Sequence, residues 1–336
     1  MPVKTFGSVA QKLFNILATQ DKTVDIGNFM DRVSLDAIGK VGFGFEFNAV
    51  EDPNNHWVRI YHDIDNGMRD PLFAHFPFLD HPALVWMFPA RKDLHRRLDS
   101  FMDMLMEVVK NKRRLLEKNE EEQVEVHERD LLTLMIQSAP DEKSGLNDEE
   151  LKNNMKLFFL GGQSTTSNAL AFITYYLATN KDVQEKARKE ANEILGDEMR
   201  DIIPTVEQLK KMKYIDMIIK EVLRISPPAT QIIPRRATED VDIGGYFIPK
   251  NTVLVADIYD IHHNPAIWKD PETFNPDRFL PDGEADKLSG AWLTFSSVRK
   301  YTWALSEDSK HKDKLRTTMG DLVVPIDLKI TLTERY

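Results

Sequence analysis

The stretch 220–228, "KEVLRISPP", places two opposite charges inside an otherwise aliphatic helical pattern. Glu221 and Arg224 stand three residues apart, so they share one face of a helix. Such a pair is usually a surface ion pair worth about 0.2–0.5 kcal/mol. Here aliphatic residues flank it on both sides, which predicts partial burial and a need for further partners. Pro227 and Pro228 then end the helix.

A third charged residue completes this pattern. The segment 274–279, "FNPDRF", sets Arg278 between aromatic residues. Two guanidinium groups on one carboxylate make a planar arrangement with many hydrogen-bond donors. We therefore predict that Glu221, Arg224 and Arg278 form a buried structural lock that takes no part in chemistry.

Composition limits the classes of function. The 336 residues are 42% hydrophobic, enough for one large core or two smaller ones. The formal net charge of −10 repels a phosphate backbone, so no nucleic acid partner is expected. The chain has no cysteine, which excludes disulfides, thiolate nucleophiles and thiolate metal ligands together. No apolar run approaches the roughly 18 residues of a spanning helix, so the chain as written is expected to be soluble.

The order of the periodic patterns predicts the fold class. Residues 1–225 show helical spacing, with helices expected from about 90 to 116, from a capping pair at Asn147 and Glu150, and from 181 to 195. Residues 226–336 alternate and turn, as in "DIGGYFIPKN", which predicts short strands and a meander. We expect a mainly α fold with small β-sheets, in a single domain over 1–336.

Some local patterns imitate catalytic motifs. The glycines of residues 39–47, "GKVGFGFEF", follow no strand and lack the G-x-G-x-x-G order, so they indicate the end of a helix that starts at Ile26. His262 and His263 are adjacent without metal-ligand spacing, and we interpret them as ordinary turn residues. The chain has no G-x-S-x-G nucleophile motif.

The segment 161–167, "GGQSTTS", lies inside an expected helix, although each glycine there costs roughly 1 kcal/mol against alanine. One interpretation is structural: a neighbouring helix packs on Gly161 and Gly162 while hydroxyl groups bond back to helix carbonyls. The other is functional: the helix opens locally, something flat lies against the glycines, and a hydroxyl reaches a reacting group. The segment alone favours the structural interpretation.

Taken in order, these segments resemble the cytochrome P-450 haem-thiolate monooxygenases. Glu221-Val-Leu-Arg224 resembles that family's E-x-x-R helix, and "FNPDRF" resembles its Phe-x-Pro-x-Arg-Phe segment. "GGQSTTS" is similar to the kinked helix over the distal haem face, and residues 234–279 resemble the strands and meander that approach the haem loop. Any one of these motifs is a weak indication of the family, but several of them in the family's order are a specific one. They imply the cytochrome P-450 fold, here incomplete.

The resemblance implies site residues, a cofactor and partners. Thr165 stands where the family has its oxygen-activating threonine, and Ser164 stands where an acid usually precedes it. The implied cofactor is haem, with Gly161 and Gly162 against it and Arg235 at the place of a propionate-binding arginine. The implied substrate is an apolar small molecule, expected against the helix before Gly161 and near residues 230–233. Electrons would come from an NADPH-cytochrome P-450 reductase, because no flavin or nicotinamide motif is present.

The haem loop departs most strongly from the family. In the family this loop has the pattern F-x-x-G-x-R-x-C-x-G, which aligns without gaps to residues 295–304 of this chain, "FSSVRKYTWA". Phe295 fits and is expected at the cofactor, but Thr302 occupies the cysteine position, and its hydroxyl is a poor iron ligand. We therefore expect no metal ligand in this chain. Because residues 301–336 resemble the family's C-terminal strands, we interpret the difference as loss of a segment near Ser297 that carried the cysteine loop and the following helix.

Two functions remain open. One is a haem-dependent monooxygenase by descent, inactive as the sequence stands. The other is a non-catalytic, haem-free remnant or a binding module for an apolar ligand. The chain is also expected to begin partway through the family's helical domain, without the segment that anchors such proteins to the endoplasmic reticulum membrane.

Overall fold

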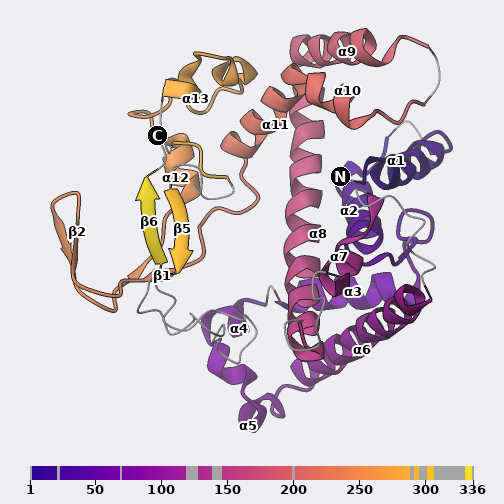
Figure 1. Cartoon of the computed structure of the whole chain (residues 1–336), viewed down its shortest axis with the longest axis vertical. Helices are drawn as coiled ribbons and strands as arrows, with labels where there is room; N and C mark the ends of the chain where they lie inside the picture. Colours follow the sequence, from indigo (N-terminus) through magenta and orange to yellow (C-terminus); the bar gives the residue numbers. More distant parts are fainter. Residues whose placement is uncertain are drawn as a thin grey trace. The chain divides into compact units, whose positions relative to one another are not determined.

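The computed structural model describes residues 2–20, 23–68, 70–118, 128–137, 146–198, 201–287, 291–294, 301–305 and 330–334. The chain divides into two compact units, Met1–Ala171 with Asp197–Lys211 and Phe172–Gly196 with Met212–Tyr336. Helices dominate the described residues and the strands are short, so the expected mainly α class is confirmed (Figure 1). The single-domain assignment stays a prediction.

All regular secondary-structure elements among the described residues of the first unit are helices. Its elements are α1 (Val3–Leu17), α2 (Ile26–Phe43), α3 (His56–Met68), α4 (Pro71–His75), the 3-10 helix η1 (Pro77–Asp80), α5 (Pro82–Val85), α6 (Pro89–Glu117), α7 (Leu131–Gln137), α10 (Val206–Lys211) and most of α8 (Asp148–Thr179).

The second unit combines helices with strands. Its helices are the end of α8, α9 (Lys181–Leu195), α11 (Lys213–Ile225), α12 (Ile258–His263), the 3-10 helix η3 (Pro276–Phe279) and α13 (Glu284–Lys287). Its strands are β1 (Arg235–Arg236), β2 (Val241–Ile243), β3 (Tyr246–Ile248), β4 (Val253–Leu254), β5 (Tyr301–Leu305) and β6 (Ile330–Glu334).

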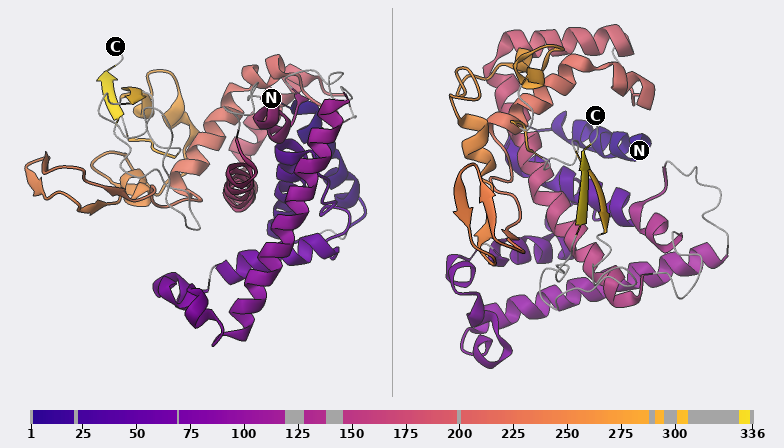
Figure 2. Two further views of the ribbon diagram at one scale, coloured as in Figure 1. Left: turned by 60° about the horizontal axis from the view of Figure 1, so that its bottom comes forward. Right: turned by 60° about the vertical axis from the view of Figure 1, so that its left-hand side comes forward.

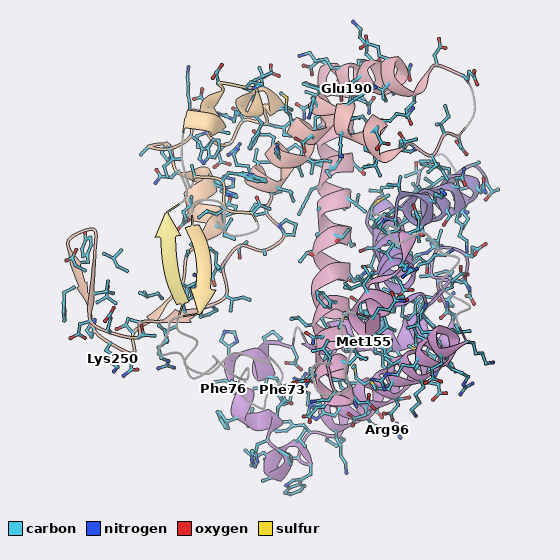
Figure 3. All side chains as sticks on the ribbon, in the orientation of Figure 1. Phe73, Phe76, Arg96, Met155, Glu190 and Lys250 are labelled. Atoms are coloured by element: carbon cyan, nitrogen blue, oxygen red, sulfur yellow. The ribbon has the colours of Figure 1, made fainter. Side chains whose placement is uncertain are left out.

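The core of the first unit forms around α8. Along the first half of this helix the buried apolar residues Leu151, Met155 and Phe159 recur at every fourth position (Figure 3). The Phe159 ring lies 4.9 Å from that of Phe101 on α6 and 5.2 Å from that of Tyr61 on α3, centroid to centroid. Such aromatic pairs contribute about 0.5–1.5 kcal/mol each beyond the area they bury. This packing determines which face of α8 the first unit covers.

Local sequence rules set the start of α8 and the end of α2. Asn147 and Glu150 form the expected capping box, in which each backbone N–H donates to the other side chain at 2.9 Å. α2 ends at Gly44, whose φ of 65° favours glycine. The other two glycines expected to end α2 lie inside it instead. At Gly39 a Cβ would meet the Phe47 ring at 2.5 Å, so close packing explains that glycine.

In the second unit, α9 holds the start of α11. The helix expected before Pro227 is interrupted at Met212, which separates α10 from α11 and offers no side-chain cap. The Glu190 carboxylate on α9 accepts the backbone N–H groups of Tyr214 at 2.7 Å and Ile215 at 3.0 Å (Figure 3). A helix start leaves such donors open, and here a neighbouring helix satisfies two of them.

The described strands form three antiparallel pairs: β1 with β4, β2 with β3, and β5 with β6. β2 and β3 make the expected hairpin, and its turn residues Gly244 and Gly245 have φ values of 62° and 87°, which favour glycine. In β5 the backbone of Thr302 pairs with that of Thr333 in β6. Figure 2 shows the β2–β3 hairpin and the β5–β6 pair from two further directions.

Replacing Glu190 by alanine is expected to lower the free energy of unfolding by about 1–2 kcal/mol, because two N–H groups of α11 lose their acceptor. Urea unfolding followed by circular dichroism measures this change. Glu193→Ala on the same helix is the matched control, since among the described residues Glu193 forms a surface ion pair with Lys189 at 3.9 Å. Equal losses in the two variants would contradict the capping role of Glu190.

Candidate functional site

The C-terminal half of α11 carries the residues expected to form the lock, Glu221 and Arg224, and both are 0% exposed. Arg224 Nε lies 2.7 Å from Glu221 Oε2 and Nη2 lies 2.9 Å from Oε1, so the guanidinium donates two parallel hydrogen bonds. Arg224 also donates to the carbonyl groups of His262 and Pro271, each at 2.8 Å. These partners compensate a charge pair whose burial would otherwise be costly.

Arg278, the third expected member, is attached more loosely. It comes from η3, is 5% exposed, and its Nε lies 3.4 Å from Glu221 Oε1. This is an ion pair, but within the described residues the Nε–H makes no hydrogen bond. Its other nitrogens donate to Glu284 and to the carbonyl of Asp270. The backbone N–H of Asn275 donates to Glu221 Oε1 at 2.9 Å, and this bond ties "FNPDRF" to α11.

His262 was expected to be an ordinary turn residue, and that expectation is wrong. It lies in the helix α12 and is fully buried. Its Nδ1 lies 3.1 Å from the Arg224 carbonyl oxygen, and its Nε2 lies 3.0 Å from the backbone nitrogen of Leu293. A carbonyl can only accept and an N–H can only donate, so the ring is neutral with its proton on Nδ1. The adjacent His263 is partly exposed and stacks on Tyr259.

The "GGQSTTS" segment contains one packed glycine and one open glycine. α8 runs through it without interruption. A Cβ on Gly162 would meet Ile38 of α2 at 2.9 Å, so this glycine permits close helix packing. A Cβ on Gly161 would meet no described atom within 4 Å, and the Thr165 hydroxyl donates to the Gly161 carbonyl at 2.7 Å. The structural interpretation therefore explains Gly162 and the hydroxyl, but it does not explain Gly161.

Gln163 fixes the rotation of α8 at this segment. It is 1% exposed, its Nε2 donates to Asp31 Oδ1, and its Oε1 accepts from the Tyr61 hydroxyl. Ser34 Oγ on α2 donates to the Gln163 carbonyl at 2.7 Å. Bonds from α2 and α3 thus turn Gln163 inward. Thr165, two residues further along the helix, consequently lies on the exposed side.

The remaining predicted site residues fall in different parts of the chain. Ser164 is partly exposed on α8, and Arg235 is exposed in β1 opposite Leu254. Phe295 lies outside the described residues. Thr302 lies in β5. The predicted residues of α8 belong to the first unit and Arg235 to the second, so each is described within its own unit.

The described residues offer no alternative metal site, because none of their His, Asp and Glu side chains form a group of three or more suited to a metal ion. No described helix combines the length and apolar character needed to cross a bilayer. A cavity of about 530 Å³ lies in the first unit between α3, α4 and α6, and its lining includes Arg91, Leu94 and Phe73. Figure 3 labels Phe73. None of the predicted site residues lines this cavity.

Comparison with known proteins gives the family. The family model described as "Cytochrome P450" matches residues 3–297. The chain belongs to the cytochrome P450 family. Cytochrome P450 3A5 of Homo sapiens is 33% identical over 288 residues, which are 82% of this chain and 54% of that protein. Cytochrome P450 3A6 of Oryctolagus cuniculus is 32% identical over 288 residues, again 82% of this chain and 54% of that protein. The chain thus spans about half the length of the curated relatives it matches.

Solved structures share the fold of this P450 chain. The structure described as "Crystal structure of cytochrome P450DA heme domain" has a TM-score of 0.70, covers 99% of this chain and 73% of its own, and is 22% identical. At that identity the likeness concerns the fold alone. The expected family and the expected P450 fold are confirmed, and members of this family use haem.

Gln163 and His262 are among the buried polar residues that the sequence reasoning did not identify. Gln163 could have been identified, because it follows Phe159 at the spacing of four that links Leu151, Met155 and Phe159, which indicates a position near the core-facing side of α8. His262 left no comparable signal. Its hydrogen-bond partners lie 38 and 31 residues away along the chain, and no local pattern encodes them.

Arg224→Ala is expected to lower the free energy of unfolding by about 3–5 kcal/mol, because it leaves the Glu221 carboxylate buried without its main partner. Arg278→Ala should cost less, since its link to Glu221 is a 3.4 Å contact without a hydrogen bond. Lys220→Ala is the control on the same helix, because Lys220 makes a surface ion pair with Asp216 at 2.7 Å. Denaturant unfolding measures all three. A loss for Arg224→Ala no larger than that for Lys220→Ala would contradict the lock.

The pKa of His262 is lowered from its ordinary value of 6.5 to about 4, first by desolvation and further by the Arg224 charge. Above pH 6.5 the ring is neutral in both the folded and the unfolded state, and its stabilising contribution is complete. As the pH falls towards 4, the unfolded state binds a proton that the folded state excludes, so stability falls by about 3 kcal/mol.

Unfolding free energies measured between about pH 7 and about pH 4 test this dependence. His262→Gln should remove that part of the acid sensitivity, whereas His263→Gln should retain it. An unchanged pH dependence in His262→Gln would show that another group is responsible.

Proposed function

We propose that the chain descends from a haem-dependent monooxygenase that hydroxylates an apolar small molecule, and that it cannot carry out this reaction as its sequence stands. The observation that carries the proposal is the absence of cysteine from all 336 residues. In haem-thiolate enzymes a cysteine thiolate supplies the electron density that favours O–O cleavage. No other side chain supplies a thiolate.

The exposed side of α8 suits the distal part of a haem site. Gly161 leaves open space where a Cβ would stand, as a flat ring lying against the helix requires. Leu157 and Phe158, 50% and 40% exposed, add apolar surface one turn earlier, where we expect the substrate. Following the resemblance, we assign Gly161 to cofactor contact, Thr165 and Ser164 to holding ordered water, and Arg235 to a propionate. Gly162, also expected at the cofactor, instead packs against Ile38 of α2.

The residues at the ligand loop do not fit haem-thiolate ligation. Thr302 aligns with the cysteine, yet its backbone belongs to the antiparallel strand β5, as expected of the family's C-terminal strands and not of its ligand loop. The match to the family model also ends at residue 297, where the deletion hypothesis places the break. Both observations support the hypothesis that the cysteine was lost with a whole segment, in preference to replacement of the cysteine alone by threonine. Haem-dependent oxygen chemistry is therefore not expected of this chain.

The parent reaction needs a separate electron donor. This chain carries no flavin or nicotinamide motif, so the electrons would come from a reductase of the NADPH-cytochrome P-450 type. The second candidate function is binding of an apolar small molecule by the haem-free chain. The exposed apolar side chains of Leu157 and Phe158 favour it, because they need no iron to bind such a ligand.

The absorption spectrum of the purified chain with haem, a reductant and carbon monoxide tests the proposal. Without a thiolate ligand, no thiolate-type shift of the Soret band is expected. A related haem-thiolate enzyme under the same conditions is the positive control. A thiolate-type shift in this chain would overturn the proposal.

The variant Thr302→Cys distinguishes deletion of a segment from substitution of one residue. Deletion predicts that this variant behaves as Thr302→Ser does, because a single cysteine in β5 does not rebuild the loop and the helix that follows it. Substitution predicts that Thr302→Cys alone restores the thiolate-type spectrum. Recovery in Thr302→Cys, with none in Thr302→Ser, would therefore refute the deletion.

A further inference from the structure

Residues 291–294 directly precede the position at which the family's haem loop begins, and hydrogen bonds hold them to α11 and α12. The backbone N–H of Leu293 donates to His262 Nε2 at 3.0 Å. The indole N–H of Trp292 donates to the Lys220 carbonyl at 3.3 Å. Ala291 is buried at 6% exposure. The segment is thus attached at consecutive residues to the helices that surround the lock.

His262 connects this segment to the arginine of the lock. Its Nδ1–H donates to the Arg224 carbonyl at 3.1 Å, while Arg224 Nη1 donates to the His262 carbonyl at 2.8 Å. Each residue therefore binds the backbone of the other through its own side chain. The second ring nitrogen of His262 remains for Leu293. Only a neutral ring protonated on Nδ1 makes both ring bonds at once.

We propose that His262 is a positioning residue: its imidazole couples the C-terminal end of α11 to Leu293 and so fixes the direction in which the chain enters the haem-loop position. The functional meaning of this coupling rests on the proposed descent from a haem monooxygenase. The coupling itself needs no haem, because every group in it is a described residue of this chain.

Burial and nearby charges keep the ring in its neutral form. Desolvation lowers the pKa of His262 most, and the charges of Arg224 on α11 and His263 on α12 lower it further. The Glu221 carboxylate on α11 pairs with Arg224 and also accepts a hydrogen bond from the backbone of Asn275. Protonation would turn Nε2 into a donor facing the N–H of Leu293 and would break that bond.

Glutamine and asparagine separate the two bonds of the ring. The amide oxygen of glutamine reaches about as far as Nε2, so His262→Gln can still accept from Leu293 although it loses the donor at Nδ1. The amide of asparagine reaches only as far as Nδ1, so His262→Asn keeps the donor to Arg224 and loses the acceptor for Leu293. Both variants lose ring volume, so a role in packing alone would affect them alike.

Hydrogen exchange at the Leu293 amide, measured on the full chain by NMR at neutral pH, is the test. His262→Asn is expected to speed this exchange about tenfold, and His262→Gln should stay within about threefold of the native rate. His263→Asn and His263→Gln are the matched controls and should leave the rate unchanged. The amides of α11, read in the same spectra, report whether the fold is intact.

Equal acceleration in both His262 variants, or none in either, overturns the proposal. If a variant unfolds, the proposal is tested instead by the tautomer of His262 in the native chain. The ¹⁵N resonances of the two ring nitrogens show which of them carries the proton. A proton on Nδ1 supports the coupling, and a proton on Nε2 refutes it. Neither measurement involves haem, so this result is independent of the carbon monoxide spectrum that tests the proposed function.

Discussion

The buried carboxylate of Glu221 is the constraint on which the second unit depends. At 0% exposure it has no access to water, and it finds its partners in two hydrogen bonds from Arg224 and one from the backbone of Asn275. Arg224 in turn donates to the carbonyls of His262 and Pro271, so segments far along the chain are held against α11. Breaking any of these links leaves a charge or a polar group buried without compensation, which is why such a network specifies one arrangement.

A cluster of polar side chains around Gln163 fixes α8, as the ion pair fixes α11. Burial of Leu, Met and Phe side chains is non-directional and tolerates small rotations of a helix. Gln163 donates to the Asp31 carboxylate and accepts hydrogen bonds from the hydroxyl groups of Ser34 and Tyr61, and these bonds remove that freedom. The exposed side of α8, with Thr165, follows from this anchoring. Each unit thus contains a polar network that holds in place the helix carrying the residues of the P450 resemblance, Thr165 on α8 and Glu221 on α11.

The sequence was informative wherever structure depends on local spacing. Spacing alone put Glu221 and Arg224 on one helix face, and the α8 capping box and the β2–β3 turn followed from residues adjacent in the chain. Long-range packing was not readable. Gly39 is explained by the ring of Phe47 and His262 by its bond to Leu293, and neither contact leaves a periodic trace. The helical pattern is interrupted at Met212 because a new helix, α11, starts there, and its first N–H groups are capped by Glu190 of a different helix, α9.

The chain shares the cytochrome P450 fold and contains no cysteine, the residue that supplies the thiolate in haem-thiolate enzymes. The proposed loss of a contiguous segment would account for both, because the lock lies before the proposed break and the strands β5 and β6 lie after it. Sequencing the gene and its transcript between the codons of Ser297 and Tyr301 tests this most directly. The account predicts a cysteine-encoding segment there that this chain omits, and a continuous coding match without such a segment would contradict it.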